Sequence, residues 1–132
     1  MISTRGRYAI RVMIDLAEQH SDKFVPLKDI AERQGISKKY LEIILKEMVA
    51  AELVDSASGK GGGYKLLRPT DEYTIGEIIE TLEGPLSPVA CLADSKYDCN
   101  RKGICKTLPM WKEYAELQHN FFYSKKLSDI VG

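Results

Sequence analysis

Two short amphipathic segments separated by one glycine constrain the fold more than any other feature of the chain. In residues 26–33, with Pro26 in the first turn, apolar residues recur at helical spacing, and Gly35 then supplies the left-handed residue that ends many helices. Ser37 is the expected N-cap of the next helix, because its hydroxyl can accept an unpaired backbone N–H. The apolar face of that helix comprises Leu41, Ile44, Leu45, Met48 and Val49. The sequence therefore predicts a helix-turn-helix.

A glycine-rich stretch follows this pair of helices. Two short apolar runs, residues 53–57 and 64–67, flank Ser58-Gly-Lys-Gly-Gly-Gly, which is the pattern of a β-hairpin. A helix-turn-helix followed by a hairpin is typical of a winged helix, whose wing tip reaches the nucleic acid beside the recognition helix. The tip also resembles a phosphate-binding loop, but no helix opens directly after it and no Lys-Ser or Lys-Thr pair closes it. Nucleotide binding is therefore disfavoured.

The remaining periodic segments are helical. We expect helices at 4–19, at 74–83 with Thr74 as cap, and from Pro109 to about Tyr123, followed by a helical turn at 127–131. Large apolar side chains cover more than one face of the last long helix, namely Met110, Trp111, Tyr114, Leu117, Phe121 and Phe122. So wide an apolar surface predicts packing against a second copy of the chain.

The expected fold class is mainly α with a small β-hairpin wing, a winged helix-turn-helix with a long C-terminal dimerisation helix. Its parts are a DNA-binding domain at 1–83, a cysteine-bearing loop at 84–108, and the dimerisation helix with its tail at 109–132.

The cysteines are the second informative feature. Cys91, Cys99 and Cys105 are the chain's only three, and all lie in a stretch without periodicity. No segment is apolar enough to span a membrane, and Arg11 and Asp15 interrupt the apolar run that a signal peptide needs. We therefore expect a cytoplasmic protein, in which disulfides are seldom structural. The thiols could be metal ligands, redox-active groups or packed side chains, and the C-x-x-C pairs of zinc sites are absent.

Charge is divided unevenly along the chain. The net charge is zero, which excludes a protein that coats nucleic acid by charge alone, but residues 1–70 hold twelve Lys or Arg against nine Asp or Glu. A basic front half and an acidic back half fit a nucleic-acid head on a sensory body. The exposed start of the second helix in the pair carries Ser37, Lys38, Lys39 and Tyr40, which suit phosphates and base edges.

Two arginines open the first helix. A helix N-terminus disfavours cations by its dipole, so Arg5 and Arg7 there suit a phosphate partner, which backbone N–H groups would also hold. Lys60 in the wing is a further candidate phosphate contact. Tyr40 has an alternative role, which is to pack against the first helix.

Several motifs together resemble one known family. These are Thr4-Arg-Gly-Arg-Tyr-Ala9, Ile30-Ala-Glu-Arg-Gln-Gly-Ile-Ser37, Tyr40-Leu-Glu42, Gly61-Gly-Gly-Tyr64 and Leu82-Glu-Gly-Pro85. They resemble the Rrf2 family of bacterial winged-helix regulators over nearly the whole chain. The resemblance implies a homodimer on a pseudo-palindromic double-stranded DNA operator. The expected DNA-binding residues are Arg5, Arg7, Lys28, Ser37, Lys38, Lys39, Tyr40, Glu42, Ser58 and Lys60.

The cysteine-bearing branches of the family imply an iron–sulfur cluster. Carried over by position, its ligands would be Cys91, Cys99 and Cys105. The fourth ligand is open, because Leu108 stands where the IscR branch has a histidine and Arg7 where the nitric-oxide-sensing branch has a carboxylate. A two-iron and a four-iron cluster both stay open. In the wing, Ser58 stands where an IscR-like chain has an arginine.

The leading interpretation is a DNA-binding transcriptional regulator whose cluster senses iron, redox state or nitric oxide; a repressor is expected, but the sequence leaves repression and activation open. The alternative is a CymR-like repressor of sulfur or cysteine metabolism, signalled by a partner protein or by thiol oxidation without metal; the stretch Leu82-Glu-Gly-Pro-Leu-Ser-Pro-Val89 is similar to that branch. An enzyme is disfavoured, because a thiol oxidoreductase would need a C-x-x-C pair or a histidine placed to activate a thiol.

Overall fold

The computed structural model describes residues 2–19, 22–87 and 106–131. Cys91, Cys99 and Cys105 lie outside these residues, so the predicted ligand set lies outside the description as well. In chain order the elements are α1 (Thr4–Glu18), α2 (Leu27–Gln34), α3 (Lys38–Ala50), β1 (Val54–Ala57), β2 (Gly63–Leu66), η1 (Thr70–Glu72), α4 (Ile75–Glu83), α6 (Leu108–Ser124) and η2 (Leu127–Asp129).

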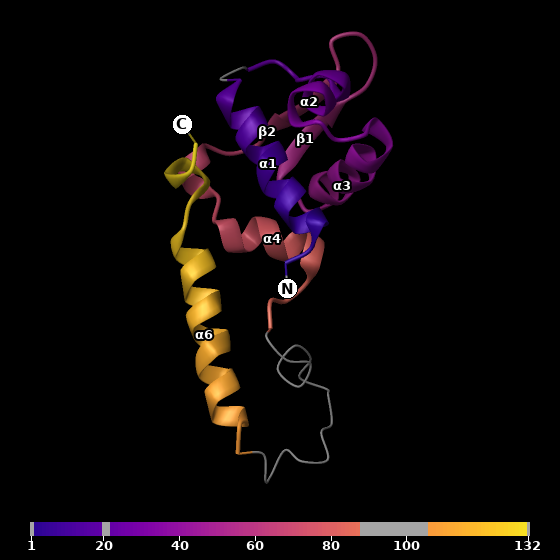
Figure 1. The fold of residues 1–132 in the computed structure, drawn as a ribbon. Helices are drawn as coiled ribbons and strands as arrows, with labels where there is room; N and C mark the ends of the chain where they lie inside the picture. The colour runs from indigo at the N-terminus through magenta and orange to yellow at the C-terminus, as the bar shows by residue number, and fades with distance from the viewer. Residues whose placement is uncertain (1, 20–21, 88–105, 132) are drawn as a thin grey trace.

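The elements divide into a head and a stalk. The head comprises α1 to α4 with the hairpin, and the stalk is α6, which projects away from the head (Figure 1). In the head, α1 packs along α4 and also contacts α2 and α3. The described part of the chain is thus mainly helical with one two-stranded antiparallel sheet, and the predicted fold class is confirmed.

The core of the head is apolar and closely follows the predicted helix faces. Ala9, Val12 and Met13 of α1 are fully buried. The face of α3 points into the same core, with fully buried Leu41, Ile44, Leu45 and Met48. From α4, the core receives Ile75, Ile78, Ile79 and Leu82.

The helix-turn-helix forms as its local signals predict, with one correction at Pro26. Gly35 ends α2 in the left-handed region at φ 64°, and the Ser37 hydroxyl accepts a hydrogen bond from the Tyr40 N–H at 3.2 Å. Pro26, predicted in the first turn of α2, is instead extended and forms its N-cap. The reason is a backbone pairing of the preceding residue: the Val25 N–H donates to the Tyr64 carbonyl at 2.8 Å, and the return bond is 2.9 Å.

The hairpin forms at the predicted place. Val54 pairs with Leu66 and Ala57 with Gly63, and the Val25–Tyr64 bridge adds a third short segment to one side. Gly63 has φ 144°, and a Cβ there would lie 2.1 Å from the Val25 carbonyl oxygen. Only glycine fits so close an approach of two backbones, which explains this end of the glycine run.

A buried tyrosine joins the hairpin to α4. Tyr73 is fully buried, and its hydroxyl donates to the Leu53 carbonyl at 2.6 Å. The same oxygen accepts from the Leu67 and Arg68 N–H groups, each at 3.0 Å. One hydroxyl thus pairs backbone groups at both ends of the hairpin. The Thr74 cap that follows is confirmed, and Glu77 completes a capping box with it.

The stalk joins the head at its C-terminal end. A Cβ on Gly76 of α4 would lie 2.4 Å from the Tyr123 ring, so the two elements touch there. The Tyr123 hydroxyl donates to Glu80 at 2.7 Å, and the Ile75 N–H donates to the Lys125 carbonyl at 2.8 Å. Leu127, in the predicted helical turn, is fully buried against the head.

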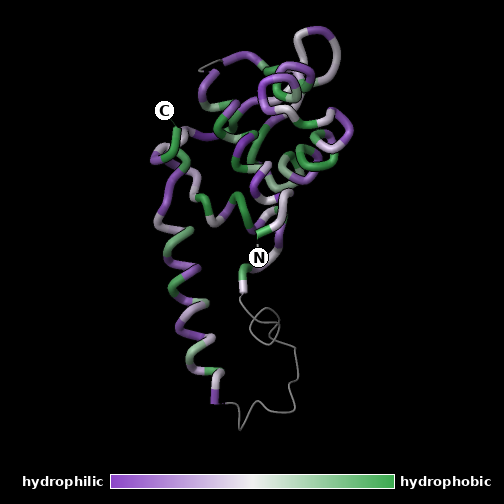
Figure 2. Tube along the Cα trace, viewed as in Figure 1, coloured by the Kyte–Doolittle hydropathy of each residue, from purple (hydrophilic) through white to green (hydrophobic). Residues whose placement is uncertain are grey.

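The rest of the stalk is accessible. No residue of α6 is buried, and Met110, Tyr114, Leu117 and Phe121 are 50–63% exposed. Green and purple segments alternate along this helix (Figure 2), and in the head the apolar side chains of α1, α3 and α4 are buried. Of the helices that the structure describes, none combines the length and apolarity needed to cross a bilayer.

Candidate nucleic-acid interface

The outward face of α3 is centred on three residues. Lys39, Ile43 and Lys46 follow one another at spacings of four and three, opposite the buried face, and all three are exposed. Ile43 is 50% exposed. This face therefore presents two ammonium groups with an apolar side chain between them. Lys38 and Glu42, both predicted DNA contacts, are exposed beside it.

The start of α3 meets α1 at a cleft rich in hydroxyl groups. The cleft has a volume of about 440 Å³ and is lined by Thr4, Tyr8, Gly35, Ile36, Ser37 and Tyr40. Tyr40 is half-buried and packs edge-to-face on Tyr8, with ring centroids 5.7 Å apart, so the alternative role predicted for it is confirmed. Hydroxyl donors commonly bind DNA phosphates, which suits this cleft to the backbone beside a recognition helix.

The N-terminus of α1 is already filled by a carboxylate, which overturns part of the reasoning about Arg5 and Arg7. Glu83, the last residue of α4, accepts from the Ser3 N–H at 2.7 Å, from the Gly6 N–H at 3.2 Å and from the Ser3 hydroxyl. These are the N–H groups that we expected to hold a phosphate. Burial alone would raise the pKa of the Glu83 carboxyl, but the hydrogen bonds from Ser3 and Gly6, with the charge of Arg5, lower it.

The two arginines differ in their surroundings. Arg5 forms an ion pair with Glu47 of α3, and both side chains are about 40% exposed, at 39% and 41%. An ion pair that accessible contributes little to stability, so a phosphate can compete for Arg5. Arg7 is exposed and donates to the Thr4 hydroxyl at 3.3 Å. Both remain predicted DNA contacts through their side chains.

The wing and α2 border a second cleft. It has a volume of about 380 Å³ and is lined by Pro26, Leu27, Ser56, Ala57, Ser58, Gly59, Gly62, Gly63 and Tyr64. Ser58 and Lys60 at the tip are exposed, as is Lys28, which follows Leu27 on α2. The wing therefore carries one hydroxyl and one ammonium group as its predicted DNA contacts. Burial raises the pKa of Tyr64 at the base of the wing.

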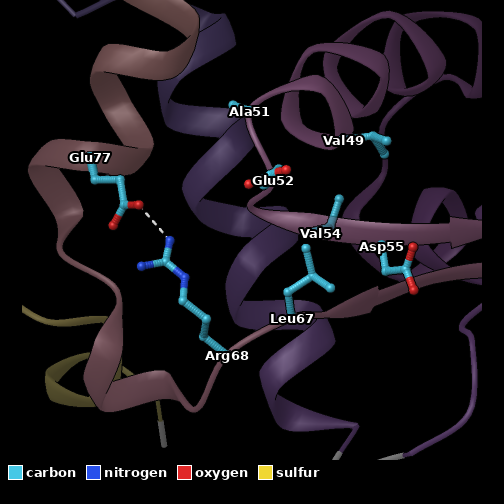
Figure 3. Close-up of a pocket in the computed structure, with 8 residues that line it drawn as sticks. All are labelled: Val49, Ala51, Glu52, Val54, Asp55, Leu67, Arg68 and Glu77. Atoms are coloured by element: carbon cyan, nitrogen blue, oxygen red, sulfur yellow. Dashed lines mark hydrogen bonds and ion pairs between the residues drawn. The ribbon is translucent and has the colours of Figure 1, made fainter.

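A third cleft, at the root of the hairpin, is acidic. Figure 3 shows its lining from α3, the hairpin and α4; its volume is about 670 Å³. Glu52, Asp55 and Glu77 contribute carboxylates, and Arg68 points to Glu77 and forms an ion pair with it. That hydrogen bond raises the pKa of Arg68. Three carboxylates against one paired guanidinium repel phosphates, so this cleft does not belong to the interface.

A buried polar cluster fixes how α1 meets α2. Asp15 is only 2% exposed and accepts from Arg33 at 2.8 Å and 3.0 Å and from Gln34 at 2.9 Å. The hydrogen bond to Asp15 raises the pKa of Arg33. In the sequence, Asp15 appeared only as a break in an apolar run. Lys46 was also missed, although its spacing of seven from Lys39 is a visible signal for the outward face.

The described residues contain no group of three or more His, Cys, Asp or Glu side chains that could hold a metal. Of the two positions that the family resemblance marks for a fourth ligand, Leu108 is the first residue of α6 and Arg7 is on the head. Neither side chain can bind iron. His119 stacks on Tyr123 with ring centroids 4.4 Å apart. Helical rise places it roughly 16 Å along the stalk from Leu108.

Comparison with known proteins gives concordant results. The family model described as "Rrf2: Iron-dependent Transcriptional regulator" matches residues 2–132. The protein named Rrf2 from Nitratidesulfovibrio vulgaris is 34% identical over 130 residues, covering 98% of this chain and 86% of the relative. The regulator IscR of Yersinia pestis is 33% identical over 131 residues, covering 99% of this chain and 79% of the relative.

Solved structures agree with these sequence relatives. CymR of Bacillus subtilis, described as the global cysteine regulator, superposes with a TM-score of 0.81 at 35% identity and covers 98% of this chain and 95% of its own. IscR of T. potens superposes with a TM-score of 0.77, also at 35% identity, covering 98% and 85%.

Proposed function

The chain belongs to the Rrf2 family of transcriptional regulators. From this premise we propose that it is a homodimeric repressor whose affinity for its operator depends on an iron–sulfur cluster. Family membership confirms the resemblance, a regulatory function through DNA, and the expectation that the chain is not an enzyme. We further propose the operator contacts, the dimer and the cluster described below, and a cytoplasmic location, because a transcriptional regulator acts on the chromosome there.

The observation that carries the DNA-binding part is the outward face of α3. An α-helix fits the major groove, and Lys39 and Lys46 bring cations to it while Ser37 and Lys38 stand at its start. Arg5, Arg7, Lys28 and Lys60 would contact the phosphate backbone on either side. We accordingly propose three parts for the chain: a DNA-binding part at 1–83, a cysteine-bearing loop at 84–108 and a dimerisation part at 109–132.

The stalk supports the homodimer. Met110, Tyr114, Leu117 and Phe121 recur at spacings of four, three and four, which places them in one stripe along α6. Four large apolar side chains in water are unfavourable, and a second copy with the same stripe covers them symmetrically. Replacing Leu117 with Glu should give a monomer by analytical ultracentrifugation. Lys112→Glu, on the opposite side of α6, is the matched control and should stay dimeric.

The cluster part rests on the chemistry of the donor set. Cys91, Cys99 and Cys105 are three thiols close in sequence, and thiolates are the ligands that iron–sulfur clusters use. When bound, the cluster would supply a group that responds to iron supply, oxidation or nitric oxide. The chain's own residues would hold it and would pass a change in the loop to Glu83 on one side and to α6 on the other.

Glu83 would connect the cysteine-bearing segment to the DNA-binding head. It ends α4, precedes the cysteine-bearing segment and binds the N-terminus of α1, the helix that carries Arg5 and Arg7. A shift of the segment that favours or disfavours this contact would change the position of the arginines. DNA needs only to bind one of the two positions better for the equilibrium to respond.

Anaerobic purification followed by an iron and sulfide count with absorption spectroscopy tests the cluster. Cys99→Ala should lose iron and visible absorbance, whereas Ser128→Ala, a small exposed residue of the tail, should keep both. Full iron retention by Cys99→Ala would overturn the cluster proposal.

A CymR-like repressor of sulfur metabolism is the second candidate, favoured by the superposition on CymR. In it, a partner protein or thiol oxidation supplies the signal. A colourless anaerobic preparation that binds its operator with full affinity would select this candidate over the first.

A further inference from the structure

We propose that Ile43 reads the methyl group of one thymine in each half-site of the operator. The inference rests on the proposed DNA binding by α3 and adds a rule of sequence preference to it. It identifies one T·A position per half-site at which an apolar contact, and not a hydrogen bond, distinguishes the base.

The position of Ile43 is the first reason. It is 50% exposed in the middle of the outward face of α3, with Lys39 one turn before it and Lys46 one turn after it. The two lysines can reach phosphates or purine edges on either side, which would seat the helix with Ile43 against the floor of the groove. An apolar side chain is then central in an otherwise charged surface.

The chemistry of isoleucine is the second reason. Exposed isoleucine favours helix formation less than leucine, lysine or glutamate does, because its branched Cβ restricts rotation against the preceding turn. Ile43 therefore stabilises neither the core nor the helix. The same branching holds its methyl groups in one preferred rotamer, so they present a fixed apolar surface to whatever docks on α3.

The chemistry of the groove identifies the base. Thymine is the one base whose major-groove edge carries a methyl group; the other bases are distinguished there by their hydrogen-bond donors and acceptors. Isoleucine pressed on a polar edge removes water without replacing its hydrogen bonds, which costs binding free energy. The side chain thus favours thymine and penalises cytosine at the same position.

Single exposed hydrophobic residues are common on protein surfaces. The test therefore has to distinguish an Ile43 that contacts a base from an Ile43 that is merely exposed. The full-length chain, purified anaerobically, is first used to select a duplex from a random pool. In the enriched sequence each thymine is then replaced, one at a time, by deoxyuridine, which differs only in lacking the methyl group. Affinities are measured by fluorescence anisotropy for wild type, Ile43→Ala and Ile130→Ala.

Replacing one particular thymine in each half-site should lower the affinity of the wild type about fourfold. This factor corresponds to the free energy of burying one methyl group. Ile43→Ala should bind thymine and deoxyuridine equally at that position. Ile130→Ala is the matched control, an isoleucine 44% exposed on the tail, and should keep the wild-type preference. Equal thermal midpoints of Ile43→Ala and wild type would show that folding is unaffected.

The outcomes separate the two proposals. If no duplex is enriched, DNA binding by this chain fails, and the inference falls with it. If a duplex is enriched but no thymine shows a methyl effect, or Ile43→Ala retains that effect, the inference alone is overturned and DNA binding stands.

Discussion

The head and the stalk use similar residues in opposite ways. In the head, the apolar face of each helix is covered by the others, so that Leu45 and Ile78 are fully buried. In the stalk, the apolar residues are as large, yet Leu117 is 63% exposed and no residue of α6 is buried. A helix of either kind is amphipathic in sequence. The difference shows that an amphipathic helix requires a second apolar surface to pack against. Whether the same chain or another molecule supplies that surface depends on the rest of the fold.

This contrast has an energetic consequence. Most of the stability of a helix in a protein comes from packing its apolar face. The head can satisfy that requirement within one chain, so its stability should not depend on protein concentration. The stalk, by contrast, should gain stability from association and therefore with concentration.

The largest expected effect contrasts one residue from each region. Ile78→Ala should lower the free energy of unfolding by about 3–4 kcal/mol, because it removes buried atoms and leaves a cavity. The loss should be equal at low and high protein concentration in urea denaturation. Leu117→Ala, the matched stalk variant, should change unfolding only at concentrations where wild type dimerises. A concentration-independent loss for Leu117→Ala would break the comparison.

A smaller effect tests how the head is closed. Tyr73→Phe removes the hydroxyl that pairs the Leu53 carbonyl and two backbone N–H groups, and should destabilise the fold by about 2–3 kcal/mol. Tyr114→Phe, in the half-exposed apolar stripe of the stalk, should change the free energy of unfolding by a few tenths of a kcal/mol at most, which is typical of surface substitutions. Similar losses in the two variants would contradict the division into a closed and an open region.

The junction between the regions gives a third test. Gly76→Ala should cost about 1–2 kcal/mol, because the new methyl group meets the Tyr123 ring and overpacking exceeds the gain in helix propensity. In a Tyr123→Ala background the ring is absent, and the same substitution should become stabilising by roughly 0.5 kcal/mol through helix propensity alone. A thermal denaturation cycle over the four proteins measures this change of sign. If the sign stays the same, α4 and α6 do not meet at Gly76.

The smallest effect concerns Glu83, where the head ends. Glu83→Gln should cost about 1 kcal/mol at neutral pH, through loss of the charge at the N-terminus of α1. Because the folded pKa lies below the ordinary 4.5, the carboxylate stabilises the fold fully above that value and loses its effect as pH falls through the folded pKa. The difference between variant and wild type should therefore shrink below about pH 4.5. Glu116→Gln, which removes an exposed charge from the stalk, is the control and should change stability at neutral pH by a few tenths of a kcal/mol at most.

Local signals predicted most of the fold. Gly35, Ser37 and Thr74 act within a few residues of their own positions, so sequence spacing suffices to recognise them. The features missed are pairings across long separations. Asp15 with Arg33 and Glu83 with Ser3 join residues 18 and 80 positions apart, and no local pattern marks either pair.

The candidate site was predictable to a different degree. Which residues stand on the exposed start of α3 follows from helical periodicity, and the centring of that face on Ile43 and Lys46 follows from the same rule applied further along. The occupied N-terminus of α1 was not predictable, because its carboxylate comes from another helix. The DNA contacts and the three cysteine ligands stay predictions.

The attachment of α6 near Tyr123 makes the helix a lever with its fulcrum at α4. Helical rise places Leu108 roughly 22 Å from that fulcrum, so a tilt of about 10° there displaces the far end by roughly 4 Å. The far end is also where the chain enters from the cysteine-bearing stretch. Conversely, when two stalks pair along their apolar stripes, the same tilt rotates the recognition helix of each subunit relative to that of the other. A duplex of fixed helical repeat can bind only a narrow range of such angles.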